Sequence, residues 1–321
     1  MPTYDAILLL SHGGPEGPDD VLPFLENVVR GKRIPRQRLL EVASRYELFG
    51  GKSPINDQNR ALRAALSNEL TAHGVKLPVY WGNRYWHPLL ADTLRKMAND
   101  GVRHALAFVT SAFDSYSSYR QYLEDIERAR QEIGSDAPQV EKLRLFYNHP
   151  GFIEPMAERV AAALEQIPIE RQAEAVLLFS AHSIPKTMAA GSPYESQVHE
   201  SCRLVAEAVG PSRAGSRSDW QLAYQSRSGP PTEPWLEPNL LEHLAQLGKS
   251  GQVRDVILVP IGFLSENMEV VYDLDIEAQA VCEHFNMQMV RAAVVGTHPR
   301  FVTMIRELIE ERVQENLTST R

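Results

Sequence analysis

The chain has 321 residues, of which 43% are hydrophobic and 23% are charged, and its formal net charge is −8. This composition is typical of a globular protein with one large or two average domains, and the acidic balance argues against the clustered basic side chains that nucleic-acid binding needs. The opening residues, MPTYDAILLLSH, lack the basic segment of a secretory signal, and no window approaches the ~20 apolar residues of a membrane span, so we expect a cytoplasmic protein without stable membrane insertion.

Short apolar strands alternate with helical patterns along the chain. In the first half, strands are predicted at Ala6–Leu10, Leu77–Trp81, Ala105–Thr110 and Leu143–Tyr147, and helices near Asp19–Arg30, Asp57–Ala72, Leu89–Asp100 and Ser118–Ile133. In the second half, strands are predicted at Ala175–Phe179, Gln221–Ala223, Val256–Pro260 and Gln288–Ala292, and helices near Gly151–Glu165, Glu195–Ala208, Leu240–Leu247, Met268–Cys282 and Arg300–Glu315. This alternation predicts an α/β protein with parallel sheets flanked by helices.

The two halves also resemble one another. The segment AILLLSHGGP at 6–15 resembles AVLLFSAHSIP at 175–185, because each is an apolar strand that runs into Ser and His. Looser pairs are WGNRYWHP at 81–88 with YQSRSGPP at 224–231, and AFVTSAF at 107–113 with LVPIGF at 258–263. A chance likeness among strand ends is the alternative to an internal repeat.

We interpret these patterns as two related α/β domains with a cleft between their strand ends. The predicted N-terminal domain covers residues 1–148 and the C-terminal domain covers 149–298. A C-terminal helix over 299–321 is expected to pack back on the first domain.

His182 is the first candidate for chemistry, because the stretch FSAHSIPKT at 179–187 delivers it directly after a predicted strand. Open α/β sheets present their functional groups at the carboxyl ends of strands. A hydrogen-bonded histidine with a purely structural role is the alternative.

A row of carboxylates follows in GFLSENMEVVYDLDIEAQ at 262–279. Glu269, Asp273 and Glu277 fall at i, i+4 and i+8, so a helix places them on one face, where like charges repel by about 0.2–0.5 kcal/mol a pair. No Lys or Arg occurs from Phe263 to Val290. Such a row suits a hydrated divalent cation, and we favour metal handling over a solvated acidic face.

His182 and Glu269 form a candidate pair, since each follows a predicted strand of the second half. Imidazole and carboxylate together suit a borderline divalent metal such as ferrous iron, and both groups can accept protons near neutral pH. Two ligands are too few to hold a metal permanently, so we expect the metal to pass through. Which group is the base and which is the ligand stays open.

Other segments suit a flat ligand that carries carboxylates. Aromatic side chains cluster in WGNRYWHP and in SAFDSYSSYRQY at 111–122, and Arg30, Arg45 and Ser53 can pair with carboxylates. Core aromatics and surface arginines are the alternatives. A nucleotide is not supported: GKS at 51–53 lacks the upstream glycine of a phosphate-binding loop, and SHGGPEG lacks G-x-G-x-x-G spacing.

In order along the chain, SRYELFGGKSPIND, SAHSIP, YQSRSGPPTEPWLEP and GFLSENMEVVYDLD resemble the ferrochelatases over nearly the whole sequence. GGPEGPDDVLPFLENVVRG and WGNRYWHP look most like the bacterial branch that uses coproporphyrin III. The resemblance implies two Rossmann-like domains and insertion of Fe²⁺ into a porphyrin during haem biosynthesis. Protoporphyrin IX as substrate, a chelatase for another metal or tetrapyrrole, and a non-catalytic carrier are the alternatives.

The family motifs also imply residue roles. His182 and Glu269 match the metal-binding and catalytic pair, and Asp273 and Glu277 match the acidic row that escorts the metal. The positions that hold the porphyrin and its propionates are matched by His12, Arg30, Arg45, Tyr46, Ser53, Tyr119 and Tyr122, with Tyr119 preferred to Tyr122.

Some positions depart from the family pattern. His12 stands where the bacterial branch often carries Tyr or Phe, and Asn267 stands where many relatives have histidine. Some relatives bind an iron–sulfur cluster through cysteines. With Cys202 and Cys282 alone, no cluster and no cofactor beyond the Fe²⁺ substrate is expected here. Transient contact with neighbouring enzymes of the haem pathway is a further expectation.

Overall fold

Two compact units make up the chain. The computed structural model describes residues 4–31, 34–210, 220–229 and 232–318. Unit 1 consists of Met1–Thr110, Tyr119–Arg144 and Val302–Arg321, and unit 2 consists of Ser111–Ser118 and Leu145–Phe301. Each unit contains one four-stranded parallel sheet with helices around it, which confirms the predicted α/β class.

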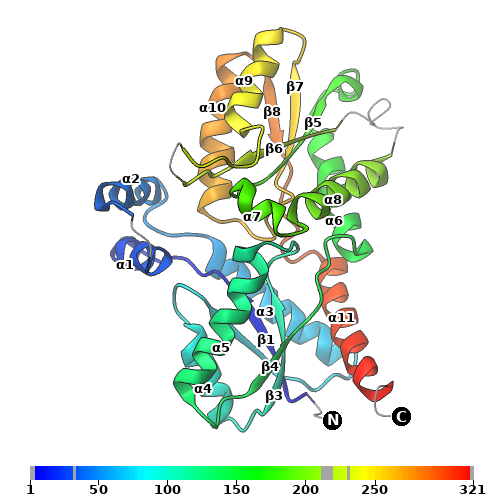
Figure 1. Cartoon of the computed structure of the whole chain (residues 1–321). Coiled ribbons are helices and arrows are strands. Elements are labelled where there is room, and N and C mark those ends of the chain that lie inside the picture. The colour runs from blue at the N-terminus through cyan, green and yellow to red at the C-terminus, as the bar shows by residue number, and fades with distance from the viewer. Residues whose placement is uncertain (1–3, 32–33, 211–219, 230–231, 319–321) are drawn as a thin grey trace. The chain divides into compact units, whose positions relative to one another are not determined.

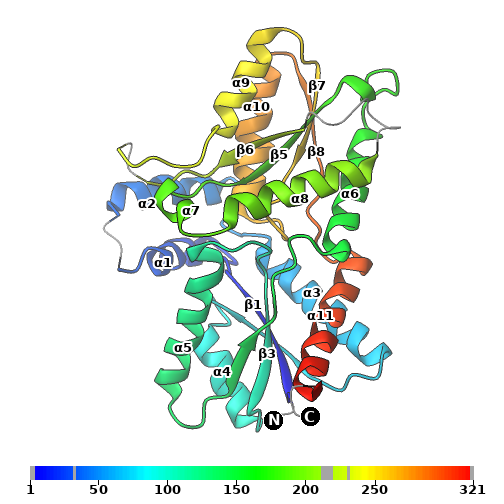
Figure 2. The same ribbon diagram turned by 45° about the vertical axis from the view of Figure 1, so that its right-hand side comes forward.

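Unit 1 is built on a sheet with the strand order β2-β1-β3-β4. The strands are β1 Ala6–Ser11, β2 Val79–Asn83, β3 His104–Val109 and β4 Gln139–Lys142. The helices of this part of the chain are α1 Pro18–Val28, α2 Arg36–Glu47, α3 Ile55–Ala72, α4 Leu90–Asn99, the π-helix η1 Tyr116–Arg120, α5 Gln121–Ile133 and α11 Pro299–Thr318. Figures 1 and 2 show α4 and α5 on one face of this sheet and α3 and α11 on the other.

The central strand of unit 1 is apolar because both of its faces are covered. All six residues of β1, AILLLS, are buried, as expected for a parallel strand between two helix layers. Ala6, Leu8 and Leu10 pack in one cluster with apolar residues of β3, α4 and α5. The sheet therefore holds the residues that follow β1, including His12, at a fixed edge.

Unit 2 repeats this plan with the strand order β6-β5-β7-β8. Its strands are β5 Val176–His182, β6 Gln221–Gln225, β7 Asp255–Val259 and β8 Gln288–Arg291. Its helices are α6 Pro150–Leu164, the 3₁₀-helix η2 Gln172–Glu174, α7 Lys186–Ala190, α8 Tyr194–Val209, α9 Leu240–Ser250, the π-helix η4 Glu269–Ala278 and α10 Gln279–His284. In Figure 1, α9 and α10 lie on one face of the sheet and α6 and α8 on the other.

The internal likeness seen in the sequence corresponds to equivalent strands. β1 and β5 occupy the same place in the two strand orders, as do β2 and β6. The N–H of Asn83 in β2 donates to the Pro88 carbonyl at 2.7 Å, and that of Tyr224 in β6 donates to the Pro238 carbonyl at 2.8 Å. Pro238 is thus the counterpart of Pro88. The predicted pairing of WGNRYWHP with YQSRSGPP is shifted, because it sets Asn83 against Ser226 and not against Tyr224. Residues 230–231 of that segment lie outside the described part of the chain.

The predicted strand at Leu143–Tyr147 is wrong, because the fourth strand, β4, lies just before it at Gln139–Lys142. β4 is an edge strand with exposed or half-buried polar residues, so it shows no apolar signal. The run after it is apolar for another reason: Leu143 and Phe146 are buried in the connection that follows. Helices α2 and α7 carry weak apolar patterns and were not predicted.

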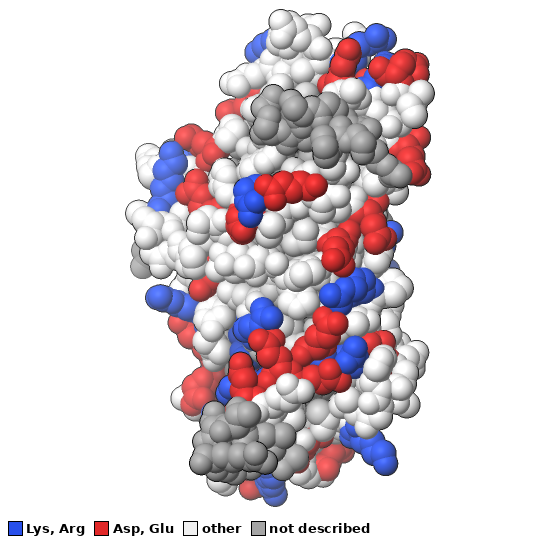
Figure 3. Space-filling view, turned by 90° about the vertical axis from the view of Figure 1, so that its right-hand side faces the viewer, with Lys and Arg blue, Asp and Glu red and all other residues white. Residues whose placement is uncertain are grey.

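The C-terminal helix α11 has a charged outer face. Figure 3 shows acidic and basic side chains intermixed there, and Arg306–Glu310 and Arg312–Glu315 are ion pairs of 2.7 and 3.1 Å along the helix. Arg306 also reaches Glu69 of α3 at 2.9 Å. Interleaved charges of this kind indicate a solvated surface. Among the described residues, no helix combines the length and the apolar character needed to cross a membrane.

Both cysteines are buried free thiols. Cys202 lies in α8 and Cys282 in α10, and neither side chain is exposed. Burial raises the pKa of Cys282 to about 11 and raises the pKa of Cys202 well above its ordinary value. Both are therefore protonated at neutral pH.

Candidate active site

His182 is the last residue of β5, and its main chain and its ring are both fixed. The hydroxyl of Tyr194 donates to the His182 carbonyl at 2.8 Å. The ring Nδ1 lies 2.5 Å from the Ser183 carbonyl oxygen. Because a carbonyl oxygen can only accept, Nδ1 carries a proton, and Nε2 is the nitrogen left to face another group. The ring itself is about one-third exposed.

Glu269 opens the helix η4, which follows β7. Its Oε1 lies 3.3 Å from Nε2 of His182, so the structure brings the predicted pair together. Asn267 lies just before the helix, and its Oδ1 accepts a hydrogen bond from the Val270 N–H at 3.0 Å. Asn267 thus has a capping contact at the position where many relatives have histidine.

The carboxylate row lies on a π-helix, whereas spacing predicts an ordinary helix. A π-helix closes its hydrogen bonds from i to i+5, so each turn is wider than an α-turn. Residues four apart then still share a face, and Glu269, Asp273 and Glu277 remain one row. π-Helical segments are rare and occur frequently at functional sites.

Burial changes along this row. The Glu269 side chain is 43% exposed, whereas Asp273 is 7% exposed and accepts a hydrogen bond from the Ser226 hydroxyl. Glu277 is half-buried.

The Lys or Arg residue nearest in sequence to this helix, Arg291, forms ion pairs with carboxylates outside the row. Arg291 of β8 pairs with Asp275 at 2.9 Å and with Glu266 at 3.1 Å, and neither of these belongs to the row. Arg291 thus compensates one acid before the helix and one acid within it that lies outside the row. Among the described residues, no three His, Cys, Asp or Glu side chains gather closely enough to hold a metal ion.

The environment of His182 favours its charged form. Burial of the imidazole disfavours the proton, but the charge of Glu269 and the hydrogen bonds to Glu269 and to the Ser183 carbonyl outweigh this effect. With a further contribution from Asp273, they raise the pKa of His182 to about 9. At neutral pH the ligand-free protein thus holds an imidazolium–carboxylate ion pair.

Gly262 connects this pair to the sheet. It lies between β7 and η4, and its N–H donates to the Ser180 carbonyl at 3.2 Å. A Cβ at this position would lie 2.9 Å from the Ala181 Cα, a backbone atom that cannot move aside easily. Only glycine therefore lets the segment that leads to Glu269 approach the end of β5.

Replacing Gly262 with alanine is expected to displace this segment and to separate His182 from Glu269. We expect Gly262→Ala to reduce at least ~10-fold the rate of any reaction that needs both side chains. It should also lower the pKa of His182, which NMR titration of the imidazole measures. Gly191→Ala is the matched control, since a Cβ there meets nothing closer than 3.7 Å. Unchanged turnover in Gly262→Ala would show that this approach does not matter.

Two of the predicted porphyrin contacts, His12 and Tyr46, pack against Phe24 in unit 1, and a third, Ser53, bonds the loop after His12. The ring of His12, which follows β1, packs against the rings of Phe24 and Tyr85 with centroids 5.9 and 4.7 Å apart. The Tyr46 ring lies 6.2 Å from Phe24. Ser53 is buried, and its N–H donates to the Pro15 carbonyl in the loop after His12.

Arg30 joins this group through one intermediate. Its guanidinium donates to Asn27 Oδ1 at 2.5 Å, and Asn27 in turn donates to the Tyr85 carbonyl at 3.2 Å. Arg45 lies half-buried on α2. The residues of this group lie on α1 and α2 or in the segments that follow β1, α1, α2 and β2.

The two candidate tyrosines differ in burial. Tyr122 is 5% exposed in the core of unit 1, with the Arg84 guanidinium 4.4 Å above its ring. Tyr119 is half-buried, and Lys142 Nζ lies 3.4 Å from its ring centroid. Tyr119 thus has more exposed surface than Tyr122, and its role as the preferred tyrosine stays a prediction.

Two supporting residues escape sequence reasoning. Tyr194 holds the His182 main chain but reads as an ordinary helix residue, because no motif marks a hydroxyl that bonds a distant carbonyl. Gly262 has a weak signal, since a glycine directly after a predicted strand often marks close backbone approach.

Comparison with known proteins gives a consistent result. The family model described as Ferrochelatase matches residues 4–313. A ferrochelatase of Rhodopirellula baltica is 53% identical over 98% of this chain and 87% of its own length. A coproporphyrin III ferrochelatase of Streptomyces coelicolor is 50% identical over 96% of this chain and 85% of its own length.

Solved structures support the fold. The sirohydrochlorin chelatase SirB from Bacillus subtilis subspecies spizizenii, solved with cobalt, has a TM-score of 0.55 and 14% identity, and the match covers 97% of this chain and 96% of that one. SirB from Bacillus subtilis, solved with Fe³⁺, has a TM-score of 0.54 and 16% identity. Two Rossmann-like units are thus the shared architecture.

Proposed function

This chain belongs to the ferrochelatase family, and on that premise we propose that it inserts Fe²⁺ into coproporphyrin III to give the iron–coproporphyrin of haem biosynthesis. The His182–Glu269 contact of 3.3 Å, which pairs an imidazole with a carboxylate, is the observation that carries the proposal. The proposed substrate follows relatives of about 50% identity that are named coproporphyrin III ferrochelatases.

Metalation of a porphyrin requires that two pyrrole N–H protons leave as the cation enters. A neutral imidazole can accept one of these protons or ligate the metal through Nε2, but an imidazolium can do neither. Since His182 is paired with Glu269 at neutral pH, its proton must leave during each cycle. We propose that Glu269 takes up metal and protons and that Asp273 and Glu277 follow it along the helix. Because His182 and Glu269 titrate as a coupled pair, both share the roles of base and metal ligand.

The porphyrin contacts are proposed in unit 1. We propose that the imidazole of His12, whose Nδ1 lies 3.0 Å from the Gly13 carbonyl oxygen, meets the macrocycle. The rings of Tyr46 and Tyr119 offer apolar contact, and Arg30, Arg45 and Ser53 can bind propionates. Four propionates, as in coproporphyrin III, offer more partners to these two cations than two propionates would.

Other features belong to the same proposal. The two cysteines are too few for a four-cysteine iron–sulfur cluster, so we propose that no cofactor takes part beyond the iron substrate. A cytoplasmic location and transient contact with neighbouring enzymes of the pathway are also proposed.

Anaerobic turnover with coproporphyrin III and protoporphyrin IX, side by side with Fe²⁺, tests this function. We expect multiple turnovers and a kcat/KM at least ~10-fold higher for coproporphyrin III, because protoporphyrin IX lacks two of the four propionates. The reverse preference would correct the substrate, and stoichiometric binding without turnover would indicate a carrier.

A further inference from the structure

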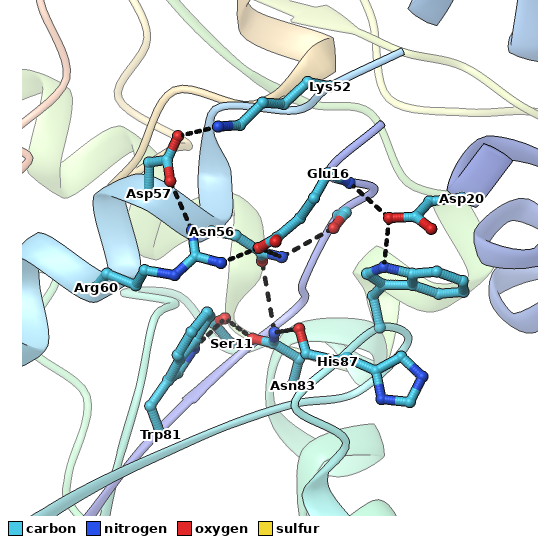
Figure 4. A network of polar contacts seen from close by, with 12 residues as sticks. Ser11, Glu16, Asp20, Lys52, Asn56, Asp57, Arg60, Trp81, Asn83 and His87 are labelled. Carbon is cyan, nitrogen blue, oxygen red and sulfur yellow. Dashed lines mark hydrogen bonds and ion pairs between the residues drawn. The ribbon is translucent and has the colours of Figure 1, made fainter. Parts of the chain in front are cut away.

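A cluster of buried amide and hydroxyl side chains lies beneath the loop that carries His12. Ser11, Asn56, Asn59 and Asn83 all have 0% exposure. The Ser11 hydroxyl donates to Asn83 Oδ1 at 2.5 Å and accepts from Asn59 Nδ2 at 2.9 Å. Figure 4 shows Ser11 and Asn83 pointing toward one another, with Asn56 beside them. The strands β1 and β2 and the helix α3 thus meet in one polar network.

This network holds the chain on both sides of His12. Ser11 precedes His12, and its side chain is bound as described above. Gly14 follows, and its carbonyl accepts from Asn56 Nδ2 at 2.9 Å. The main chain is also fixed, because the Tyr85 N–H donates to the His12 carbonyl at 3.1 Å. His12 therefore sits on a segment tied down before, at and after its own position.

Gly13 lets this segment approach the network closely. It has a φ of +82°, which L side chains rarely adopt, and a Cβ there would lie 2.8 Å from the Asn83 Cβ. Asn83 also donates from Nδ2 to the His87 carbonyl at 3.1 Å. Its amide therefore joins the loop after β1 to the loop after β2.

The network extends to a second predicted porphyrin contact. Asn56 Nδ2 donates to Glu16 Oε1 at 3.0 Å, and Glu16 forms an isolated bridge with Lys52. The adjacent Ser53 N–H donates to the Pro15 carbonyl at 2.9 Å. Ser53 is thus tied by main-chain contacts to the loop that carries His12, and Asn56 holds that same loop.

Burying polar side chains costs free energy unless they find partners, and a network in which most groups are paired admits few alternative arrangements. Among the groups named here, Asn59 Oδ1 is buried without a hydrogen-bond partner. We therefore expect the polar groups in the core of unit 1 to fix the conformation of the loop more than they raise the free energy of unfolding. We propose that Asn56 and Asn83 are positioning residues that hold the imidazole of His12 toward the iron porphyrin. This inference rests on the proposed function.

Asn56→Asp tests it, because the substitution keeps the size of the side chain but replaces the donor to Gly14 and Glu16 with an acceptor. The readout is the absorption spectrum of the protein with iron(III) coproporphyrin III, which reports the axial ligand of the iron. His12→Ala gives the spectrum without this imidazole. Leu70→Ala, a buried change in the same helix, is the control for lost stability.

We expect Asn56→Asp to shift the spectrum toward that of His12→Ala and to lower kcat several-fold more than Leu70→Ala does. A wild-type spectrum in Asn56→Asp would overturn the positioning role. If His12→Ala itself leaves the spectrum unchanged, the proposed contact of His12 fails, and the positioning role falls with it while iron insertion still stands. If Asn56→Asp does not fold, Ser11→Ala, which removes one buried hydroxyl, takes its place. Its spectrum should also shift toward that of His12→Ala, and a wild-type spectrum would overturn the positioning role.

Discussion

Replacing His182 with alanine is expected to reduce iron insertion by about 10²–10⁴-fold, the range that a positioned general base contributes. The imidazole is held by the Ser183 carbonyl, its main chain is held by Tyr194, and it faces Glu269, so alanine removes the one imidazole of this pair. Binding of coproporphyrin III should persist, because its predicted contacts are other residues. Anaerobic turnover and fluorescence titration of the porphyrin measure the two effects.

His199→Ala is the matched control, since His199 is an exposed histidine of the same unit. It should leave both quantities unchanged. If His182→Ala retained most of its turnover, the proton and metal chemistry would have to be reassigned to other groups. If it lost porphyrin binding and activity together, His182 would be a binding residue instead.

Replacing Glu269 with glutamine is expected to lower the pKa of His182 from about 9 to near or below its ordinary value of about 6.5. The substitution removes the charge that stabilises the imidazolium, while burial, which opposes it, remains. NMR titration of the imidazole resonances checks this shift. Iron insertion should fall as well, because the carboxylate that faces the imidazole is lost.

The sign of the pH effect on stability follows from the same shift. A histidine whose pKa is raised by folding stabilises the protein fully below about pH 6.5, and this contribution is lost as the pH rises through about 9. Glu269→Gln should therefore narrow the difference in melting temperature between pH 6 and pH 10. Glu283→Gln, in the adjacent helix α10, should leave it as in the wild type. An unchanged pKa in Glu269→Gln would mean that Glu269 does not govern the proton of His182.

Sequence alone predicted much of the fold, because buried parallel strands carry strong apolar signals. β1, β3, β5 and β7 were placed within two residues of their observed ends except at the end of β5, which runs three residues further to His182. β4 was missed, since a polar edge strand leaves no apolar pattern. The π-helix was not foreseen either, because the spacing of four that marks the acidic row suits both helix types.

In the candidate site, too, some residues could be predicted from the sequence and others could not. Sequence paired His182 with Glu269, and the structure puts them in contact. Their catalytic roles remain predictions. In unit 1, Asn56 and Asn83 gave no signal, because asparagine between elements usually indicates a turn. Only the folded chain shows that these amides are buried and bound to one another.

The burial and protonation of the two thiols affect how easily they are oxidised in the presence of ferrous iron. Iron of this kind reacts with oxygen to give species that oxidise exposed sulfur, and the thiolate is the form attacked first. Cys202 and Cys282 are enclosed, and the raised pKa of each keeps it protonated. Both thiols are therefore expected to be poor targets for oxidation by such species.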